Sequence, residues 1–273
     1  MPVKCLPNLL NEQVSTTGLT YEWILTTLSK HDPTFDQILN GNEVTSITAY
    51  DISVNQGYAS KIYKTSILVN DQKDPVYQVV MKIPTADCIS ELMDQMYTED
   101  QKAQMKFMAK MTDQLSKFHN VECDFYALFK GNTELPMPKV YYTQKFYPKE
   151  KQMGIIIMED LSEKGQTLGI YATLHAFQIK TIVKNLAAFH AFQLANEDNW
   201  KNRFTELAFI DEEFKDMVKP TIDSLKKCCP GMFDEAFKRT DKFFNEMSIV
   251  EYTFRGCCKD LERIQPDWLT DGA

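Results

Sequence analysis

The 273-residue sequence has no long apolar run, no excess of positive charge and no metal-ligand spacing of cysteine or histidine. No window approaches the roughly 18 consecutive apolar residues that a transmembrane helix needs. The first residues, MPVKCLPNLLNEQ, contain no apolar core of a secretory signal peptide. Lys and Arg number 30 against 38 Asp and Glu, which gives a formal net charge of −8. We therefore expect a cytoplasmic protein that neither spans a membrane nor binds nucleic acid.

Cysteine chemistry is also sparse. The seven cysteines include two adjacent pairs, Cys228-Cys229 and Cys257-Cys258, but no C-x-x-C motif. Without a secretory signal we expect reduced thiols, and a role as small buried hydrophobic residues is favoured over a redox or metal role. The four histidines are scattered along the chain, so the sequence itself predicts no metal site.

The most informative stretch that is present runs from Val76 to Pro84, VYQVVMKIP. Its β-branched and aromatic residues predict a strand, and Lys82 is its one charged residue. A lysine among apolar strand residues either extends its ammonium to water or pairs with another group. In protein-kinase-like folds a lysine in similar surroundings holds the α- and β-phosphates of ATP. An ordinary edge-strand lysine is the alternative.

Two further strands are predicted before this one, at Glu43 to Asp51 and at Lys61 to Asn70. The segment between them contains Gly57 and Ser60. A hairpin turn there could place backbone N–H groups over phosphates, because glycine permits close approach. An ordinary hairpin turn is the favoured alternative, since one glycine stands where a protein kinase has three.

A long helix is predicted next, from about Ile89 to Lys130. A stripe at roughly helical spacing predicts core packing rather than a groove for a partner: Met93, Met96, Met105, Met108, Met111 and Leu115. Farther along, Val121, Phe125 and Leu128 share a face. Glu122 borders that face and could meet Lys82; a solvated glutamate is the alternative.

Strands are predicted again at Lys139 to Phe146 and at Met153 to Met158, and Glu159-Asp160-Leu161 ends the second one. An apolar strand that breaks into acidic residues suits the hinge of a two-lobed kinase, where backbone groups meet the edge of adenine. Acidic residues are also common where an ordinary strand ends.

The remaining segments are predicted to be a loose arm at residues 1–18 and several helices. Thr20 could cap a helix from Tyr21 to Ser29, which His31-Asp32-Pro33 would stop. A helix from His175 through Ala195 carries one apolar face, on which His190 is more simply a hydrogen-bonded core residue than a catalytic one. Three more helices are predicted at Asp211 to Cys228, Met232 to Met247 and Ile249 to Leu261.

Taken together, the stretches resemble the CHK-kinase-like (ecdysteroid-kinase-like, choline-kinase-related) proteins of invertebrates, which are related to aminoglycoside phosphotransferases. The matching stretches lie in family order between about Val44 and Pro266: GYASKIYKTSIL, VVMKIP, HNVECDFYALF, LPMPKVYYTQKF, GIIIMEDLS, HAFQIKTIVKNLAAFHAFQL and FKDMVKPTIDSLKKCCPGMFDEAFK. The resemblance implies ATP as cofactor and transfer of its γ-phosphoryl group to a small hydroxylated molecule.

The resemblance also implies a role for individual residues. Lys82 matches the phosphate-binding lysine and Glu122 its ion-pair partner, while Gly57 and Ser60 match the turn that covers the phosphates. The hinge is matched by Met158, Glu159 and Leu161, acting mainly through their backbone groups. The implied fold is α+β and protein-kinase-like. Residues 1–160 would form an N-lobe with an N-terminal arm and a five-stranded antiparallel sheet, and residues 161–273 an incomplete helical C-lobe.

The sequence departs from the family at its end. In the family, the segment matching Ile264-Gln265-Pro266 leads into an H-G-D-x-x-x-x-N loop, whose Asp receives the acceptor's proton and whose Asn holds Mg²⁺. Here seven residues follow Pro266, and no H-x-D motif occurs anywhere in the sequence. The resemblance thus implies a kinase relative truncated before its catalytic loop and inactive as this chain. The alternative is a non-catalytic nucleotide-binding or interaction protein, a regulatory short form whose helical half exposes apolar surface to a protein partner.

Overall fold

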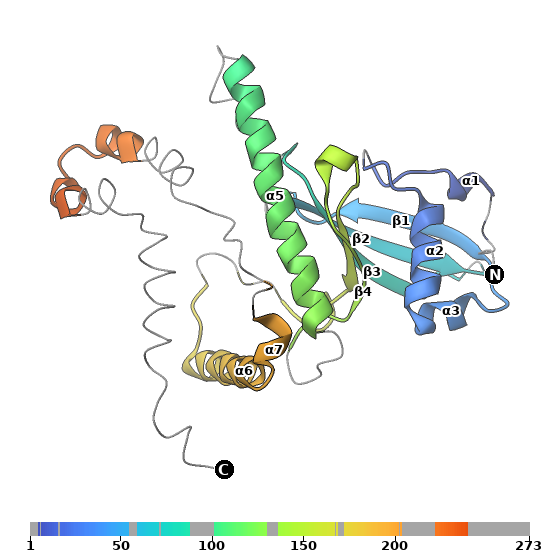
Figure 1. Ribbon diagram of the computed structural model, residues 1–273. Helices are drawn as coiled ribbons and strands as arrows, with labels where there is room; N and C mark the ends of the chain where they lie inside the picture. The colour runs from blue at the N-terminus through green and yellow to red at the C-terminus, as the bar shows by residue number, and fades with distance from the viewer. Residues whose placement is uncertain are drawn as a thin grey trace. The chain divides into compact units, whose positions relative to one another are not determined.

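The computed structural model describes residues 5, 7–15, 17–54, 59–70, 72–87, 101–129, 136–166, 168, 172–201, 203 and 222–239. Contacts between residues divide the chain into two units, Met1–Phe204 and Thr205–Ala273. The first unit contains the sheet and the helices labelled in Figure 1. The lobe boundary predicted at residue 160 is a different division, and it stays a prediction.

A five-stranded sheet is the centre of the first unit. Its strands are β1 (Val44–Asp51), β2 (Ser60–Val69), β3 (Tyr77–Pro84), β4 (Val140–Gln144) and β5 (Ile155–Glu159). They lie in the order β1-β2-β3-β5-β4, and every neighbouring pair is antiparallel. The α+β class and the five-stranded antiparallel sheet are therefore confirmed. Each predicted strand is found, with ends that differ by two residues at most.

One face of this sheet forms the core together with α2 (Tyr21–His31) and α3 (Pro33–Leu39). Alternate strand residues are buried there: Tyr63, Ile67, Val79, Met81, Ile83, Ile155 and Ile157. The same cluster contains Ile24, Leu25 and Leu28 of α2 and Phe35 of α3. Because successive side chains of a strand alternate between the two faces, Val80 and Lys82 lie on the other face, where both are half-buried.

The N-terminal segment packs more tightly than the predicted loose arm. Residues Pro7–Leu10 form the short helix α1, and Val14 is only 1% exposed within the core cluster. Cys5 pairs with Val44 in an isolated bridge beside β1. The prediction was wrong because the Val14 side chain is buried in the core and its N–H donates to the carbonyl of Leu19, another core residue, at 2.9 Å.

Helix α2 begins where the sequence predicted. The Thr20 hydroxyl accepts a hydrogen bond from the Trp23 N–H at 3.2 Å, which satisfies one donor of the first helical turn. The helix ends at His31, two residues after the predicted end. Asp32 follows and also caps the next helix, because its carboxylate accepts from the N–H groups of Thr34 and Phe35. Helix α3 was not predicted.

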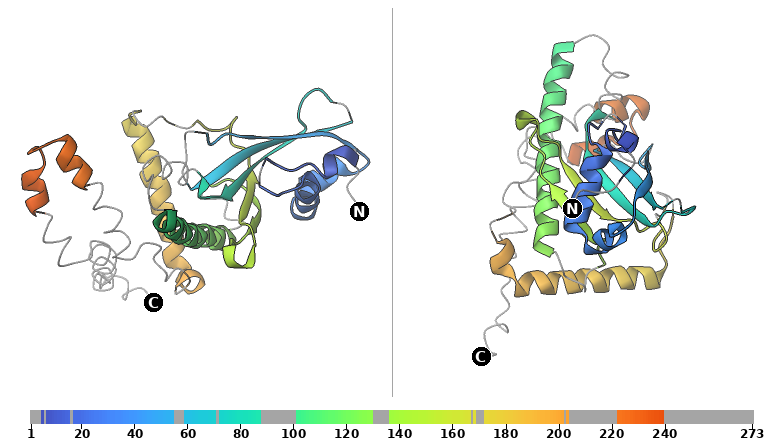
Figure 2. Two further views of the ribbon diagram at one scale, coloured as in Figure 1. Left: turned by 90° about the horizontal axis from the view of Figure 1, so that it is seen from above. Right: turned by 90° about the vertical axis from the view of Figure 1, so that its right-hand side faces the viewer.

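Helix α5 (Gln101–Phe129) contacts β3, β4 and the 3-10 helix η1 (Pro148–Glu150). Leu115 is buried as predicted, but Met105 is 74% exposed, so the predicted core stripe is wrong at that residue. The physical reason is visible in Figure 1 and in the right-hand view of Figure 2, where the first turns of α5 extend past the sheet. Met93 and Met96 lie outside the described residues.

Helices α6 (Ala176–Ala195) and α7 (Glu197–Trp200) follow the sheet. The α6 helix is confirmed, and apolar side chains along it are exposed, Val183 at 57% and Leu194 at 76% among them. His190 is exposed as well, so the favoured role as a core histidine is wrong. Helix α6 contacts α5 through aromatic rings, with Phe189 and Phe192 lying 5.2 and 5.3 Å from Phe129.

The second unit is described only at residues 222–239. Residues 222–228 and 234–239 are helical, and Gly231 adopts a φ of 78° between them, consistent with the predicted break. The adjacent Cys228 and Cys229 are exposed and half-buried, so the favoured buried role does not hold for Cys228. The predicted helix at residues 249–261, the Cys257-Cys258 pair and the closing residues lie outside the described part.

In the part of the chain that is described, no helix has the length and apolar character to cross a membrane.

Candidate functional site

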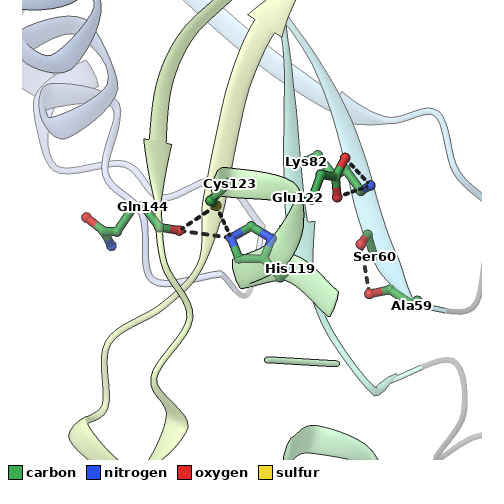
Figure 3. A network of polar contacts seen from close by, with 7 residues as sticks. All are labelled: Ala59, Ser60, Lys82, His119, Glu122, Cys123 and Gln144. Atoms are coloured by element: carbon green, nitrogen blue, oxygen red, sulfur yellow. Dashed lines mark hydrogen bonds and ion pairs between the residues drawn. The ribbon is translucent and has the colours of Figure 1, made fainter. Parts of the chain in front are cut away.

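The predicted partners Lys82 and Glu122 form an ion pair between β3 and α5. The Lys82 Nζ lies 2.8 Å from Glu122 Oε1 and 2.6 Å from Oε2, so the ammonium donates to both oxygens of the carboxylate (Figure 3). The side chains are 29% and 27% exposed, respectively. An ammonium has three N–H donors, and Glu122 accepts from two of them. One donor of Lys82 therefore remains for a ligand, and the pair is exposed enough for a ligand to reach it.

The position of Glu122 is set by neighbouring residues of α5 that bind the β4–β5 hairpin. The His119 Nε2 lies 2.8 Å from the Gln144 carbonyl oxygen, one turn before Glu122. Asn120 accepts from the Phe146 N–H at 2.7 Å and donates to the Phe146 carbonyl at 3.1 Å. These bonds fix the rotation of α5 about its axis, and that rotation directs Glu122 toward β3.

His119 is a buried, neutral anchor rather than an acid or base. A carbonyl oxygen can only accept, so Nε2 carries the proton that is shared with Gln144. Burial lowers the pKa of His119 and outweighs the opposing effect of this hydrogen bond. Nδ1 has no hydrogen-bond partner among the described residues.

Cys123 lies beside the His119 ring, with Sγ 3.4 Å from Nε2. Burial raises the pKa of its thiol to about 12, so Cys123 is no nucleophile at neutral pH.

Close approach of α5 to the hairpin depends on Gly154. A Cβ at this position would lie 2.7 Å from Cδ2 and Nε2 of His119 and 2.7 Å from Cβ of Phe146. Sequence reasoning missed His119, Asn120 and Gly154 as supports of the site. A signal was present, because a glycine inside a predicted strand often marks close backbone approach.

The predicted phosphate-covering turn is described in part. Ser60 begins β2 and pairs with Pro84, two residues along β3 from Lys82, and its hydroxyl donates to the Ala59 carbonyl at 2.8 Å. Figure 3 shows Ser60 and Ala59 near the Lys82–Glu122 pair. The structure therefore brings Ser60 close to Lys82, whereas Gly57 lies outside the described residues.

Of the three predicted hinge residues, Met158 and Glu159 end β5 and Leu161 lies two residues beyond it. Met158 pairs with Val80 and is half-buried on the Lys82 face of the sheet. The Glu159 N–H donates to the Lys139 carbonyl at 2.8 Å, and its carboxylate pairs with Lys164, which is the main cause of a lowered Glu159 pKa. The carbonyl of Leu161 accepts from two N–H groups of the following turn. A contact from Leu161 to a base would therefore have to come from its own N–H.

The described residues contain no group of three or more His, Cys, Asp and Glu side chains that could hold a metal ion. The site in view is thus an ammonium–carboxylate pair beside a half-buried apolar strip, made by Ile62, Val80 and Met158 on three neighbouring strands. Such a strip offers a flat ligand an apolar surface, with a cation at one end.

The fold and site define an α+β domain in which a strand lysine pairs with a helix glutamate. Residues 43–263 match the family DUF1679, described as "Uncharacterized oxidoreductase dhs-27", and the chain belongs to this family. It is 24% identical over 247 residues to the Caenorhabditis elegans protein of that name, a match that covers 89% of this chain and 28% of the relative. The chain thus corresponds to well under half of the relative's length. No solved structure matches it.

Proposed function

We propose that the sheet and α5 form the nucleotide-binding lobe of a kinase-like protein, related to ATP-dependent phosphotransferases that act on hydroxyl groups of small molecules. The observation that carries this proposal is the ion pair of Lys82 with Glu122, 40 residues apart, on a strand and a helix. The resemblance to CHK-kinase-like proteins supports it, and all seven matching stretches fall within residues 43–263, the range that the family matches.

The residues on this face fit the parts of ATP. Lys82 would bind phosphate oxygens with its remaining donor, held in place by Glu122. Ser60 and Gly57 would cover the phosphates from the β1–β2 turn, and the base would lie on the apolar strip, with Met158, Glu159 and Leu161 at its edge. ATP would supply the phosphoryl group, and these residues would contribute binding and orientation.

A second candidate is a non-catalytic nucleotide-binding or interaction protein. The absence of an H-x-D motif from the 273 residues favours it, because phosphoryl transfer depends on a positioned Asp and on metal ions that neutralise charge. The exposed apolar side chains of α6 also favour an interaction role. We expect these residues alone to bind nucleotide without measurable transfer; turnover that Lys82→Ala abolishes would contradict this.

The word oxidoreductase in the relative's name describes a protein of which this chain matches 28%. A dinucleotide site of the Rossmann type needs the G-x-G-x-x-G pattern, which does not occur in this sequence. An oxidoreductase role therefore has no residue-level support here, and NADPH serves as the comparison ligand in the test below.

The test is a thermal melt of the 273-residue chain with and without Mg·ATP, alongside Lys82→Ala. At a ligand concentration about 100 times Kd, wild type should gain roughly 2.7 kcal/mol of stability, and Lys82→Ala should gain almost none. Lys117→Ala is the matched control, because Lys117 forms an exposed pair with Asp113 on α5 away from this site. A melt that is raised by NADPH and unaffected by Mg·ATP would overturn the proposal.

A further inference from the structure

A second ion pair lies on the same face of the sheet as Lys82. The Lys64 Nζ of β2 is 2.7 Å from Asp160 Oδ2, and the side chains are only 15% and 8% exposed. Ser162 joins this pair, since its hydroxyl lies 3.3 Å from the Lys64 Nζ and its N–H donates to Asp160 Oδ1 at 2.9 Å. The group therefore combines a nearly buried ion pair with one hydroxyl, which comes from the exposed residue Ser162.

This pair connects two strands that are not neighbours. In the order β1-β2-β3-β5-β4, β3 separates β2 from β5, and Asp160 directly follows the last residue of β5. Neighbouring strands lie about 4.8 Å apart, so the pair bridges roughly 10 Å across β3. Lys64 pairs with Val80, and Val80 pairs with Met158. The aliphatic part of the Lys64 side chain thus crosses the sheet at the level of Val80 and Met158, two residues of the apolar strip.

Asp160 also organises the turn that leaves the sheet. Its Oδ1 accepts from both the N–H and the hydroxyl of Ser162. In the same turn the Leu161 carbonyl accepts from the N–H groups of Lys164 and Gly165 at 2.9 and 2.8 Å. One carboxylate therefore ties the turn around Leu161 to the ammonium of Lys64, and through it to the opposite side of β3.

We propose that Lys64, Asp160 and Ser162 form a positioning clamp for the base end of a bound nucleoside. The clamp holds the turn at residues 160–165 against the sheet, so that the backbone of Leu161 borders the apolar strip at a fixed height. The ligand class is a purine nucleoside or its phosphates. This inference rests on the proposed function and adds residues that act at the base, far from the phosphates.

The clamp and Lys82 act on different parts of the ligand, which makes them separable. Adenosine has a base and no phosphates, so it should depend on the clamp and not on Lys82. Lys64→Met removes the ammonium and leaves Asp160 unpaired in a buried position, which is the costly way to break such a pair. Lys64→Arg keeps the charge and should retain the clamp.

The experiment measures Kd of the 273-residue chain for adenosine and for Mg·ATP by titration calorimetry. Lys64→Met should raise the Kd for both ligands by the same factor, about tenfold. Lys64→Arg should bind both ligands almost as tightly as wild type does. Lys82→Ala should weaken Mg·ATP alone. The Lys64→Met, Asp160→Asn double variant contains no unpaired charge, so it keeps the test valid if Lys64→Met does not melt cooperatively.

The outcomes separate the two claims. If wild type binds Mg·ATP but Lys64→Met, or the double variant in its place, leaves the adenosine Kd unchanged, the clamp is wrong and the proposed function stands. Wild type that binds Mg·ATP and fails to bind adenosine also counts against the clamp, because the base end then contributes nothing. If wild type binds neither ligand, the proposed function fails and the clamp falls with it.

Discussion

Gly154 shows how closely the helix of the site approaches its sheet. A methyl group there would meet the His119 ring and the Phe146 Cβ at 2.7 Å. We expect Gly154→Ala to lower the free energy of unfolding by about 1–3 kcal/mol, because a packed interior has no room for the added carbon. Urea denaturation would measure it, with Gly165→Ala as control, since its nearest neighbour would lie at an ordinary 3.7 Å. Equal stability of the two variants would contradict this.

Glu122 is the residue that distinguishes a functional pair from a structural one. Glu122→Gln keeps the shape of the side chain and removes its charge, so Lys82 loses its charged partner while α5 keeps its anchors His119 and Asn120. We expect Mg·ATP affinity to fall by roughly 10- to 100-fold, corresponding to a charged hydrogen bond of about 1.5–3 kcal/mol. Calorimetric titration would measure the change. Asp113→Asn on the same helix should leave Kd within error.

The pairing of Lys82 with Glu122 could be predicted because each signal is local: a single charge in an apolar strand and a single carboxylate beside a helix face. The supports of that pair could not. His119 and Gly154 meet only after α5 docks on the β4–β5 hairpin, and Lys64 meets Asp160 across an intervening strand. Neither contact leaves a periodicity in the sequence.

At the scale of elements, Asp32 links helices α2 and α3 to the sheet. Its carboxylate accepts from Tyr77 Oη at 2.6 Å and from Lys139 Nζ at 2.9 Å, and it caps α3. Burial alone would raise the pKa of Asp32, but the hydrogen bonds from Tyr77 and Lys139 outweigh it and hold that pKa below its usual value. Charged Asp32 is therefore favoured by folding.

The lowered pKa gives a signed prediction for stability. The contribution of Asp32 is fully present above its unfolded pKa, near 3.8, and is lost as the pH falls through the lower folded value. We expect Asp32→Ala to cost roughly 2–4 kcal/mol at pH 7, from a lost cap and an unpaired Tyr77 hydroxyl. It should also flatten the fall in stability below pH 3.8. Urea midpoints between pH 7 and 2.5 would measure both, with the exposed Asp36→Asn as control.

The sequence predicted the strands better than the helix ends, for a physical reason. Buried strand residues such as Val79, Met81 and Ile83 alternate with half-buried ones. The signal for a strand therefore lies within its own short stretch of sequence. At His31-Asp32-Pro33 the same three residues end one helix and begin the next. Proline at the first helical position after an aspartate cap is a start signal as well as a stop signal, and only the stop was predicted.

At the scale of the whole molecule, the apolar residues of α6 set a test of packing. Ile182 is 51% exposed, whereas Phe129, which contacts α6 through Phe189, is 2% exposed. We expect Ile182→Glu to change stability by no more than about 0.5 kcal/mol and Phe129→Ala to cost about 3–5 kcal/mol. Chemical denaturation of both variants would measure this. A large loss from Ile182→Glu would mean that this face is covered in solution.

The bridge between Cys5 and Val44 has a consequence for self-association. In the strand order β1-β2-β3-β5-β4, β1 and β4 are the two edges of the sheet, and an open edge can recruit strands from other molecules. β4 is short, with Lys139 and Lys145 beside its ends, whereas β1 has eight residues. The N-terminal segment lies against the start of β1 through Cys5. Removing this segment would expose the edge of β1 and leave empty the space that Val14 fills. The N-terminal segment therefore protects the protein against aggregation through that edge.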